Sequence, residues 1–333
     1  MPISELRELV DKRLLDFVWN EWSQMGILAT PRFESPWAAD PEALLLLTLE
    51  AGRSDARVFD ETLDWLTVNG ALVSQQRLRN LCVDDDDRKL ADAALAWAGE
   101  HQPALRSARG RAVATAAEPE PLFSPWVSVG KPDPVFEAYG LLKGATQPSG
   151  KSQTPRLDLP INLAFRLRRL FGIGSRAEIV RFLLTSQLPG AETEVVRRAS
   201  GYARSNVRDV ADALVAAGVA GSYTRGAGGD RFYRVDVDRW RSFLELDQIP
   251  QHRDWPQLFA ALRLLRRWLG QPEVDTLSDY LRASEARQLM KRVEPDLRYA
   301  GVPVRDAGTG ADYWEAFVES VNAALSALTS PYR

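Results

Sequence analysis

Apolar residues recur at helical spacing near the start of the chain. The pattern predicts helices over three segments, residues 41–52, 56–70 and 74–82. The first segment begins with proline and ends with glycine, as is typical of a helix. The second places apolar residues at i, i+4 and i+7, and Ser74 can cap the third. We therefore expect an N-terminal helical domain over residues 1–102.

The three short helices predicted over 40–82 carry Arg77 and Arg79 on the last of them. They resemble a helix-turn-helix without an evident wing, and this resemblance implies a segment that could bind DNA. A scaffold or a dimerisation bundle would show the same pattern. Both interpretations stay open at this stage.

The chain also ends in a helical pattern. Residues 254–270 place large apolar side chains on one broad face, and two further amphipathic helices are expected over 278–293 and 312–328. Aromatic stripes of this kind are more often core than ligand pocket. We expect a C-terminal helical region over residues 244–333.

The periodicity weakens between these two helical parts. Residues 103–158 are rich in proline and include the segment KGATQPSGKSQTP, whose composition is typical of a linker. The sequence therefore predicts a proline-rich linker region over 103–158, with a domain boundary near residue 150.

Three helices are predicted after residue 174. The first starts at Ser175, and Glu178 follows at the spacing of a capping box. The second is shorter and is broken by Gly201. The third, residues 205–217, can begin with Ser205 as its cap. Its apolar side chains share one face, and its opposite face carries Asn206, Arg208, Asp209 and Asp212.

A hairpin with basic flanks follows the third helix. The strand VAGSYTRG turns through three glycines, and RFYRVDV returns with alternating character, so residues 219–237 are expected to pair. Residues 156–234 carry thirteen arginines and seven acids, a net charge of +6, in a chain of net charge -3. A basic module in an acidic chain indicates an anionic partner. Three of these arginines fit the solvent-exposed face of a preceding helix: Arg166, Arg168 and Arg169.

Few residues are available for metal or redox chemistry. One cysteine, Cys82, excludes an internal disulfide, and two distant histidines, His101 and His252, argue against a metal site. The four acids at 84–87 directly precede a helical pattern, and we interpret them as a solvated helix start rather than a cation site. The N-terminal stretch is charged throughout, and a run of about 18 apolar residues is absent, so we expect a cytoplasmic protein.

Motifs that would indicate an enzyme are incomplete. The segment SGKS at 149–152 lacks the earlier glycine of a phosphate-binding loop, and GAGGD lacks the spacing of a dinucleotide fingerprint. The histidines and serines do not lie in a recognisable catalytic motif. We therefore expect a protein that is not an enzyme and that uses neither cofactor nor metal.

The order of elements over about 160–240 resembles the winged helix-turn-helix of MarR-like and ArsR-like bacterial transcriptional regulators. The resemblance rests on order, on spacing and on the pattern GYARSNVRDVADALVAAGVA. It implies a fold that is mainly α with a small β-hairpin wing, and a DNA-binding domain over residues 159–243. It further implies a double-stranded DNA partner, with 205–217 as the recognition helix in the major groove and 219–237 as the wing.

The resemblance also assigns DNA contacts residue by residue. Arg208 suits guanine and Asn206 suits adenine, while Arg204 and Ser205 at the helix start are placed for phosphate. The full set of expected contacts, of which the last two flank the wing tip, is Arg176, Tyr202, Arg204, Ser205, Asn206, Arg208, Arg225 and Arg231.

Two further expectations concern partners. Regulators of the resembled type commonly pair through helices outside the reading head, so a homodimer is expected on half-sites about 34–36 Å apart. The alternative is a protein-interaction scaffold or an antitoxin-like partner, in which the same module binds another protein. Asp209 and Asp212 on the presumed reading face disfavour phosphate, and the acidic remainder of the chain is compatible with a protein partner.

Overall fold

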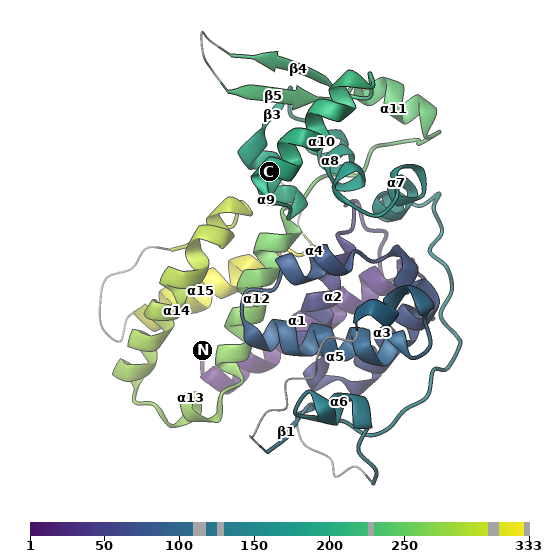
Figure 1. Cartoon of the computed structure of the whole chain (residues 1–333). Helices are drawn as coiled ribbons and strands as arrows, with labels where there is room; N and C mark the ends of the chain where they lie inside the picture. The colour runs from purple at the N-terminus through teal and green to yellow at the C-terminus, as the bar shows by residue number, and fades with distance from the viewer. Residues whose placement is uncertain (109–117, 125–129, 226–229, 306–312, 330–333) are drawn as a thin grey trace.

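The protein has a helical body and a smaller module above it. The computed structural model describes residues 1–108, 118–124, 130–225, 230–305 and 313–329. Within these residues the fold is mainly helical with two small sheets. We call residues 163–246, which carry the larger sheet, the upper module, and the remaining helices the body (Figure 1).

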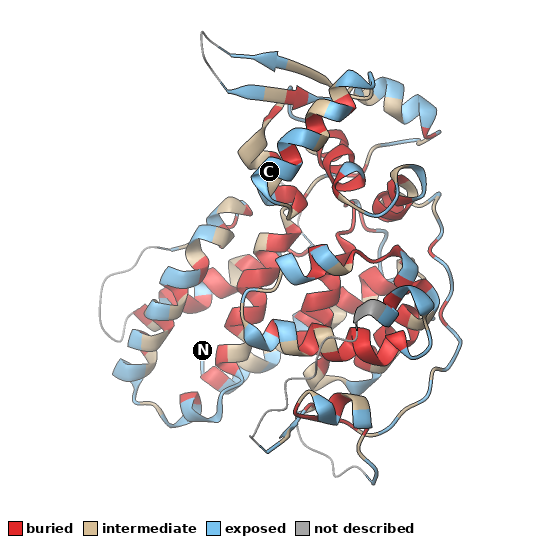
Figure 2. Cartoon of the chain, viewed as in Figure 1, coloured by how far each residue is buried: buried red, intermediate tan, exposed pale blue. Residues whose placement is uncertain are grey.

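The body is organised around one buried helix, α2. All of its residues are buried, because the apolar run LLLL and its flanks are covered by α1, α3, α5 and α12 (Figure 2). The body helices are α1 (Ile3–Gln24), α2 (Pro41–Ala51), α3 (Ala56–Asn69), α4 (Gln75–Asn80), α5 (Asp85–Gly99), α12 (Trp255–Leu269), α13 (Pro272–Thr276), α14 (Asp279–Tyr299) and α15 (Tyr313–Ser326). Short 3-10 segments are η1 (Gly52–Ser54), η2 (Gly70–Leu72), η3 (Pro103–Ala108) and η4 (Pro160–Asn162).

Helices from both ends of the chain share one hydrophobic core. The apolar face of α12 packs on α2 and α14, and its large side chains belong to the same buried cluster as those of α1 to α5. The expected N-terminal helical domain over 1–102 and the C-terminal helical region over 244–333 therefore contribute to the same core. The broad apolar face of α12 must be covered, and α2, which lies far away in the sequence, covers it.

Much of the proline-rich segment is packed against the body. It contains α6 (Pro134–Ala138) and the parallel strands β1 (Glu120–Pro121) and β2 (Leu141–Leu142). Phe136 is buried in the core of the body. The carboxylate of Asp64 accepts hydrogen bonds from the backbone N–H of Gly150 at 2.9 Å and of Ser152 at 3.2 Å. The proline-rich linker region expected over 103–158 thus makes specific contacts with the body through several of its described residues.

The upper module has a core of its own. Its elements are α7 (Leu163–Phe171), α8 (Ser175–Thr185), β3 (Ala191–Glu192), α9 (Thr193–Ser200), α10 (Arg204–Ala216), β4 (Gly221–Thr224), β5 (Arg231–Arg234) and α11 (Val237–Phe243). The strands form an antiparallel sheet in the order β3-β5-β4. The expected helices and hairpin are confirmed. The sequence did not indicate β3, because two residues are too few to show alternation.

Two predicted helix caps are wrong. Helix α10 begins at Arg204 after Ala203, so Ser205 lies inside the helix and is not its cap. Helix α8 begins at Ser175 after Gly174, so Ser175 lies inside the helix and is not its cap. Glu178 is buried and does not complete a capping box. Ser74 does cap α4, where its Oγ accepts from the N–H of Arg77 at 3.3 Å. Among the described helices, none combines the length and the apolar character needed to cross a bilayer.

Candidate nucleic-acid interface

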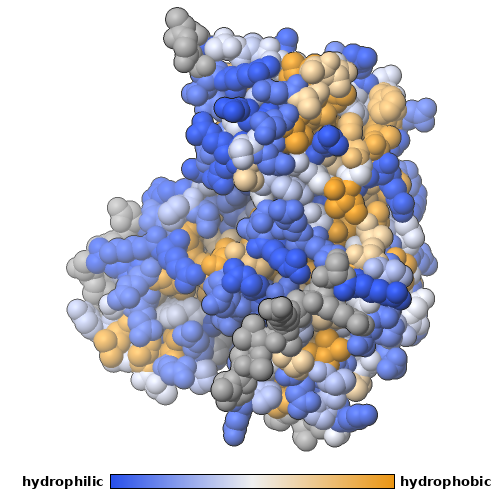
Figure 3. Space-filling view, viewed as in Figure 1, coloured by the Kyte–Doolittle hydropathy of each residue, from blue (hydrophilic) through white to orange (hydrophobic). Residues whose placement is uncertain are grey.

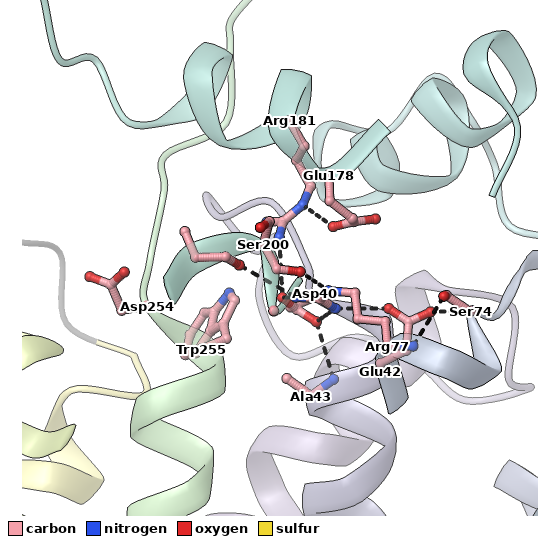
Figure 4. Close-up of polar contacts among 12 residues, drawn as sticks. Asp40, Glu42, Ala43, Ser74, Arg77, Glu178, Arg181, Ser200, Asp254 and Trp255 are labelled. Atoms are coloured by element: carbon pink, nitrogen blue, oxygen red, sulfur yellow. Dashed lines mark hydrogen bonds and ion pairs between the residues drawn. The ribbon is translucent and has the colours of Figure 1, made fainter. Parts of the chain in front are cut away.

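A buried ionic cluster joins the upper module to the body. Three arginines and three carboxylates meet where α2 and α4 of the body face α7 and α8 of the upper module. Figure 4 labels the three carboxylates together with Arg77 and Arg181. Their side chains are no more than 1 % exposed. We call this the junction cluster, and its members are Asp40, Glu42, Arg77, Arg168, Glu178 and Arg181.

Arg168 on α7 bridges both parts of the chain. Its Nη1 and Nη2 donate to the two carboxylate oxygens of Glu42, each at 2.7 Å, which is a bidentate pair. Its Nε and Nη2 also donate to Glu178 at 3.0 and 2.6 Å, and Nη1 donates to the carbonyl of Leu72 at 2.6 Å. The guanidinium group is therefore held from both sides.

Arg77 and Arg181 complete the cluster around Asp40. Arg77 donates to both oxygens of Asp40 at 2.5 Å and to the carbonyl of Ser200 at 2.6 Å. Arg181 donates to Asp40 at 3.1 Å and to Glu178 at 3.0 Å. Asp40 also accepts from the N–H of Ala43, so the same carboxylate caps α2 and binds the upper module (Figure 4).

Neighbouring arginines lower the pKa of Asp40 and of Glu178 despite the burial of both carboxylates. Burial alone would raise the pKa of Asp40, but Arg77 and Arg181 lower it below its ordinary value. For Glu178, burial is likewise outweighed by Arg168 and Arg181, so its pKa is also lowered. Three positive and three negative groups balance, and they fix the upper module on the body.

The junction cluster corrects two expectations. The Arg168 side chain is buried, so it does not lie on the solvent-exposed face of its helix, whereas Arg169 does. Arg77 is fully buried, so α4 does not present it to a duplex, and the possible second helix-turn-helix at 40–82 loses its main candidate contact. Asp40 and Glu42 had no predicted role, and Glu178 was predicted to complete a capping box. Arg181 offered a signal, because it interrupts the apolar run IVRFLL.

Helix α10 lies on the surface of the upper module. Val207, Ala211 and Leu214 face the core, and the opposite face is directed to solvent. Five residues of its first two turns are exposed, Arg204, Ser205, Asn206, Arg208 and Asp209. Among the described residues, no ion pair holds Arg204 or Arg208. Two guanidinium groups and one amide are therefore available at the start of a surface helix.

The hairpin beside α10 holds one of its two predicted arginines in place. Arg231 forms an ion pair with Asp212 of α10 at 2.8 Å and donates to Ser222 Oγ at 3.0 Å. Tyr233 donates to the same Asp212 carboxylate at 2.8 Å. Arg225 is exposed at the end of β4, while the glycine-containing tip at 226–229 lies outside the described residues. Asp212 therefore ties the hairpin to α10.

The two remaining predicted contacts differ in placement. Arg176 is exposed on the first turn of α8. The Tyr202 hydroxyl forms a 3.1 Å hydrogen bond with Ser74 Oγ of the body, and its ring is half-buried. Tyr202 thus belongs to the contact between the two parts of the chain, and we remove it from the expected DNA contacts.

The acidic run at 84–87 starts a helix, as expected, but is not fully solvated. Asp84 caps α5, and Asp87 is buried against Arg263 at 2.8 Å and Arg267 at 2.9 Å. In the described part of the chain, no group of three or more His, Cys, Asp or Glu side chains is arranged to hold a metal ion.

Comparison with known proteins adds no relative. The chain matches no protein-family model, no curated protein and no solved structure.

Proposed function

We propose that the chain is a cytoplasmic, sequence-specific regulator of transcription that binds double-stranded DNA through the upper module. The observation that carries the proposal is the start of α10, where Arg204, Asn206 and Arg208 are all exposed to solvent. The helices α8, α9 and α10 with the β4-β5 hairpin have the order expected of a winged helix-turn-helix, with α10 as the recognition helix and the hairpin as the wing.

The proposal fits the dimensions and chemistry of a duplex. The major groove of B-DNA is about 12 Å wide and admits one α-helix. An arginine can bind guanine O6 and N7, and an asparagine can bind adenine N6 and N7. Because α10 packs on α8 and α9, and the junction cluster fixes α8 on the body, the reading face is presented by a rigid support.

The test begins with selection of bound genomic fragments, followed by binding to the selected duplex across a salt series. The variant Asn206→Ala with Arg208→Ala should weaken binding and reduce discrimination against altered bases. The matched control is Lys12→Ala with Arg13→Ala, two exposed positions on α1. Equal affinity of both variants for the selected duplex, or no retention of the natural chain on any duplex, would refute the proposal.

The scaffold alternative is favoured by one observation on another side of the upper module. Leu170, Ile173 and Phe243 are 49 %, 45 % and 63 % exposed. Figure 3 shows apolar side chains gathered at the right of the upper module, where Figure 1 places α7 and α11. If this surface binds a protein, Phe243→Ser should release that protein without changing retention on DNA. If the variant Asn206→Ala with Arg208→Ala loses the protein partner and Phe243→Ser keeps it, α10 itself would have a protein-binding role.

We further propose that the regulator acts as a homodimer. Two copies related by two-fold symmetry would place two α10 helices in successive major grooves, about 34–36 Å apart. Sedimentation at micromolar concentration, with and without the selected duplex, tests this directly. A monomer under both conditions contradicts it.

A further inference from the structure

A cleft separates the start of α10 from the end of α14. Its volume is about 650 Å³, and it is lined by Arg198, Tyr202 and Ala203 on one side and by Pro295, Asp296 and Tyr299 on the other. The guanidinium group of Arg198 lies 5.0 Å from the centre of the Tyr299 ring. The body therefore reaches the edge of the proposed reading face through α14.

The exposed side of α14 carries positive charge near this cleft. Lys291 and Arg292 are exposed, and neither forms an ion pair with a described residue. The neighbouring acid Glu294 is already paired with Arg298 at 2.6 Å. Asp296 lines the cleft and is partly buried, and burial raises its pKa. Lys291 and Arg292 do not line the cleft, but they lie on α14 within about one helical turn of Pro295, which does.

Helical spacing places these groups in line with the cleft. Arg292, Pro295 and Tyr299 are separated by three and four residues, so they share one side of α14. Tyr299 and Arg292 are seven residues apart, about 10.5 Å along the helix axis. That length corresponds to about three base pairs at 3.4 Å each. Figure 3 shows hydrophilic side chains over the left of the upper module and over the adjoining region where Figure 1 places α14.

We propose that Lys291 and Arg292 of α14 bind the phosphate backbone of the same DNA duplex that α10 reads. This inference rests on the proposed function and extends it. It adds a second DNA contact, on the body, to the contact that the upper module makes, and no sequence motif indicated it. The body then takes part in DNA binding. The bound duplex continues from the hairpin, across α10 and along α14.

Salt dependence on two duplex lengths tests this inference. The variant is Lys291→Ala with Arg292→Ala, and the control is again Lys12→Ala with Arg13→Ala. On a selected duplex of about 30 base pairs, the α14 variant should lower the salt slope by about two units, since each phosphate contact contributes about 0.9. On a duplex of about 12 base pairs that ends at the α10 site on the side of α14, the slope should stay unchanged.

The outcomes separate this inference from the proposed function. If the Asn206 and Arg208 variant weakens binding while the α14 variant matches the control on the long duplex, the inference fails and the proposed function stands. If no duplex binds the natural chain, both fail. A second readout uses Arg292→Cys with a photo-crosslinker, in a Cys82→Ser background. It should cross-link the long duplex and not the short one, and absence of the long cross-link would overturn the inference.

Discussion

Helices α4 and α10 share a pattern of serine and arginine and differ in what surrounds one arginine of each. Each has a serine near its start and carries two arginines, although α4 has 6 residues and α10 has 13. Arg77 of α4 is fully buried among carboxylates, whereas Arg208 of α10 is exposed. The difference arises from α2, which supplies Asp40 and Glu42 to α4. An arginine is thus structural or free to bind according to the carboxylates that the fold brings to it.

The largest expected effect comes from breaking the junction cluster. Arg168→Met leaves Glu42 and Glu178 buried without their shared partner, and removing one member of a buried ion pair costs about 3–5 kcal/mol. Urea unfolding should show this loss as a lower free energy of unfolding. The control is Arg169→Met, an exposed neighbour, for which we expect a change within about 0.5 kcal/mol. Equal stability of the two variants would contradict a structural role for the cluster.

Glu21 is a buried carboxylate that, among the described residues, forms no ion pair with an arginine, in contrast to the carboxylates of the junction cluster. Glu21 is 2 % exposed, and its carboxylate accepts from Asn20 at 3.2 Å and Ser35 at 3.1 Å. Burial raises its pKa to about 7, from an ordinary value of 4.5, although these hydrogen bonds oppose the rise. Glu21 should therefore stay neutral in the folded chain at pH values where it is charged in the unfolded chain.

The sign of the resulting pH dependence follows from proton binding. Between pH 4.5 and about 7 the folded chain holds the Glu21 proton more tightly, so this group destabilises the fold as pH rises. Glu21→Gln removes the effect. The variant should gain up to about 3 kcal/mol over the natural chain between pH 4 and pH 8. Asp40 and Glu178 act oppositely, since their lowered pKa values make stability fall on acidification below their ordinary range. A constant difference between variant and natural chain across this range would contradict the assignment.

Arg208 should affect recognition and leave stability unchanged. Arg208→Lys keeps the charge but loses the planar fork that binds guanine, so it should reduce base discrimination by about 1–3 kcal/mol at one position of the site. Competition between the selected duplex and single-base variants measures this. Its unfolding curve should match that of the natural chain, because the side chain is exposed. Unchanged discrimination at every position would remove Arg208 from the reading face.

Local pattern predicted the helices well and their partners poorly. The residues predicted to form the apolar faces of α10 and α12 are buried. This was predictable because a helix that buries one face repeats apolar residues at i, i+3 and i+4. The joining of α12 to α2 and the burial of Arg168 were not predictable, because both depend on contacts between residues about a hundred or more positions apart. Exposure of Asn206 and Arg208 followed from the helical period, whereas the engagement of Tyr202 with Ser74 depended on the docking of the two parts.

The smallest expected difference separates the two arginines of the hairpin. Arg225→Ala should lower the salt slope of DNA binding by about one unit, the value for one phosphate contact. Arg231→Ala should lower it by less, because Arg231 is already paired with Asp212 and must leave that carboxylate to bind phosphate. Asp212→Asn removes the carboxylate that competes with phosphate for Arg231. The salt slope of this variant should therefore be steeper than that of the natural chain, by up to the value for one phosphate contact. Equal slopes for the Arg225 and Arg231 variants would mean that the ion pair opens freely on DNA.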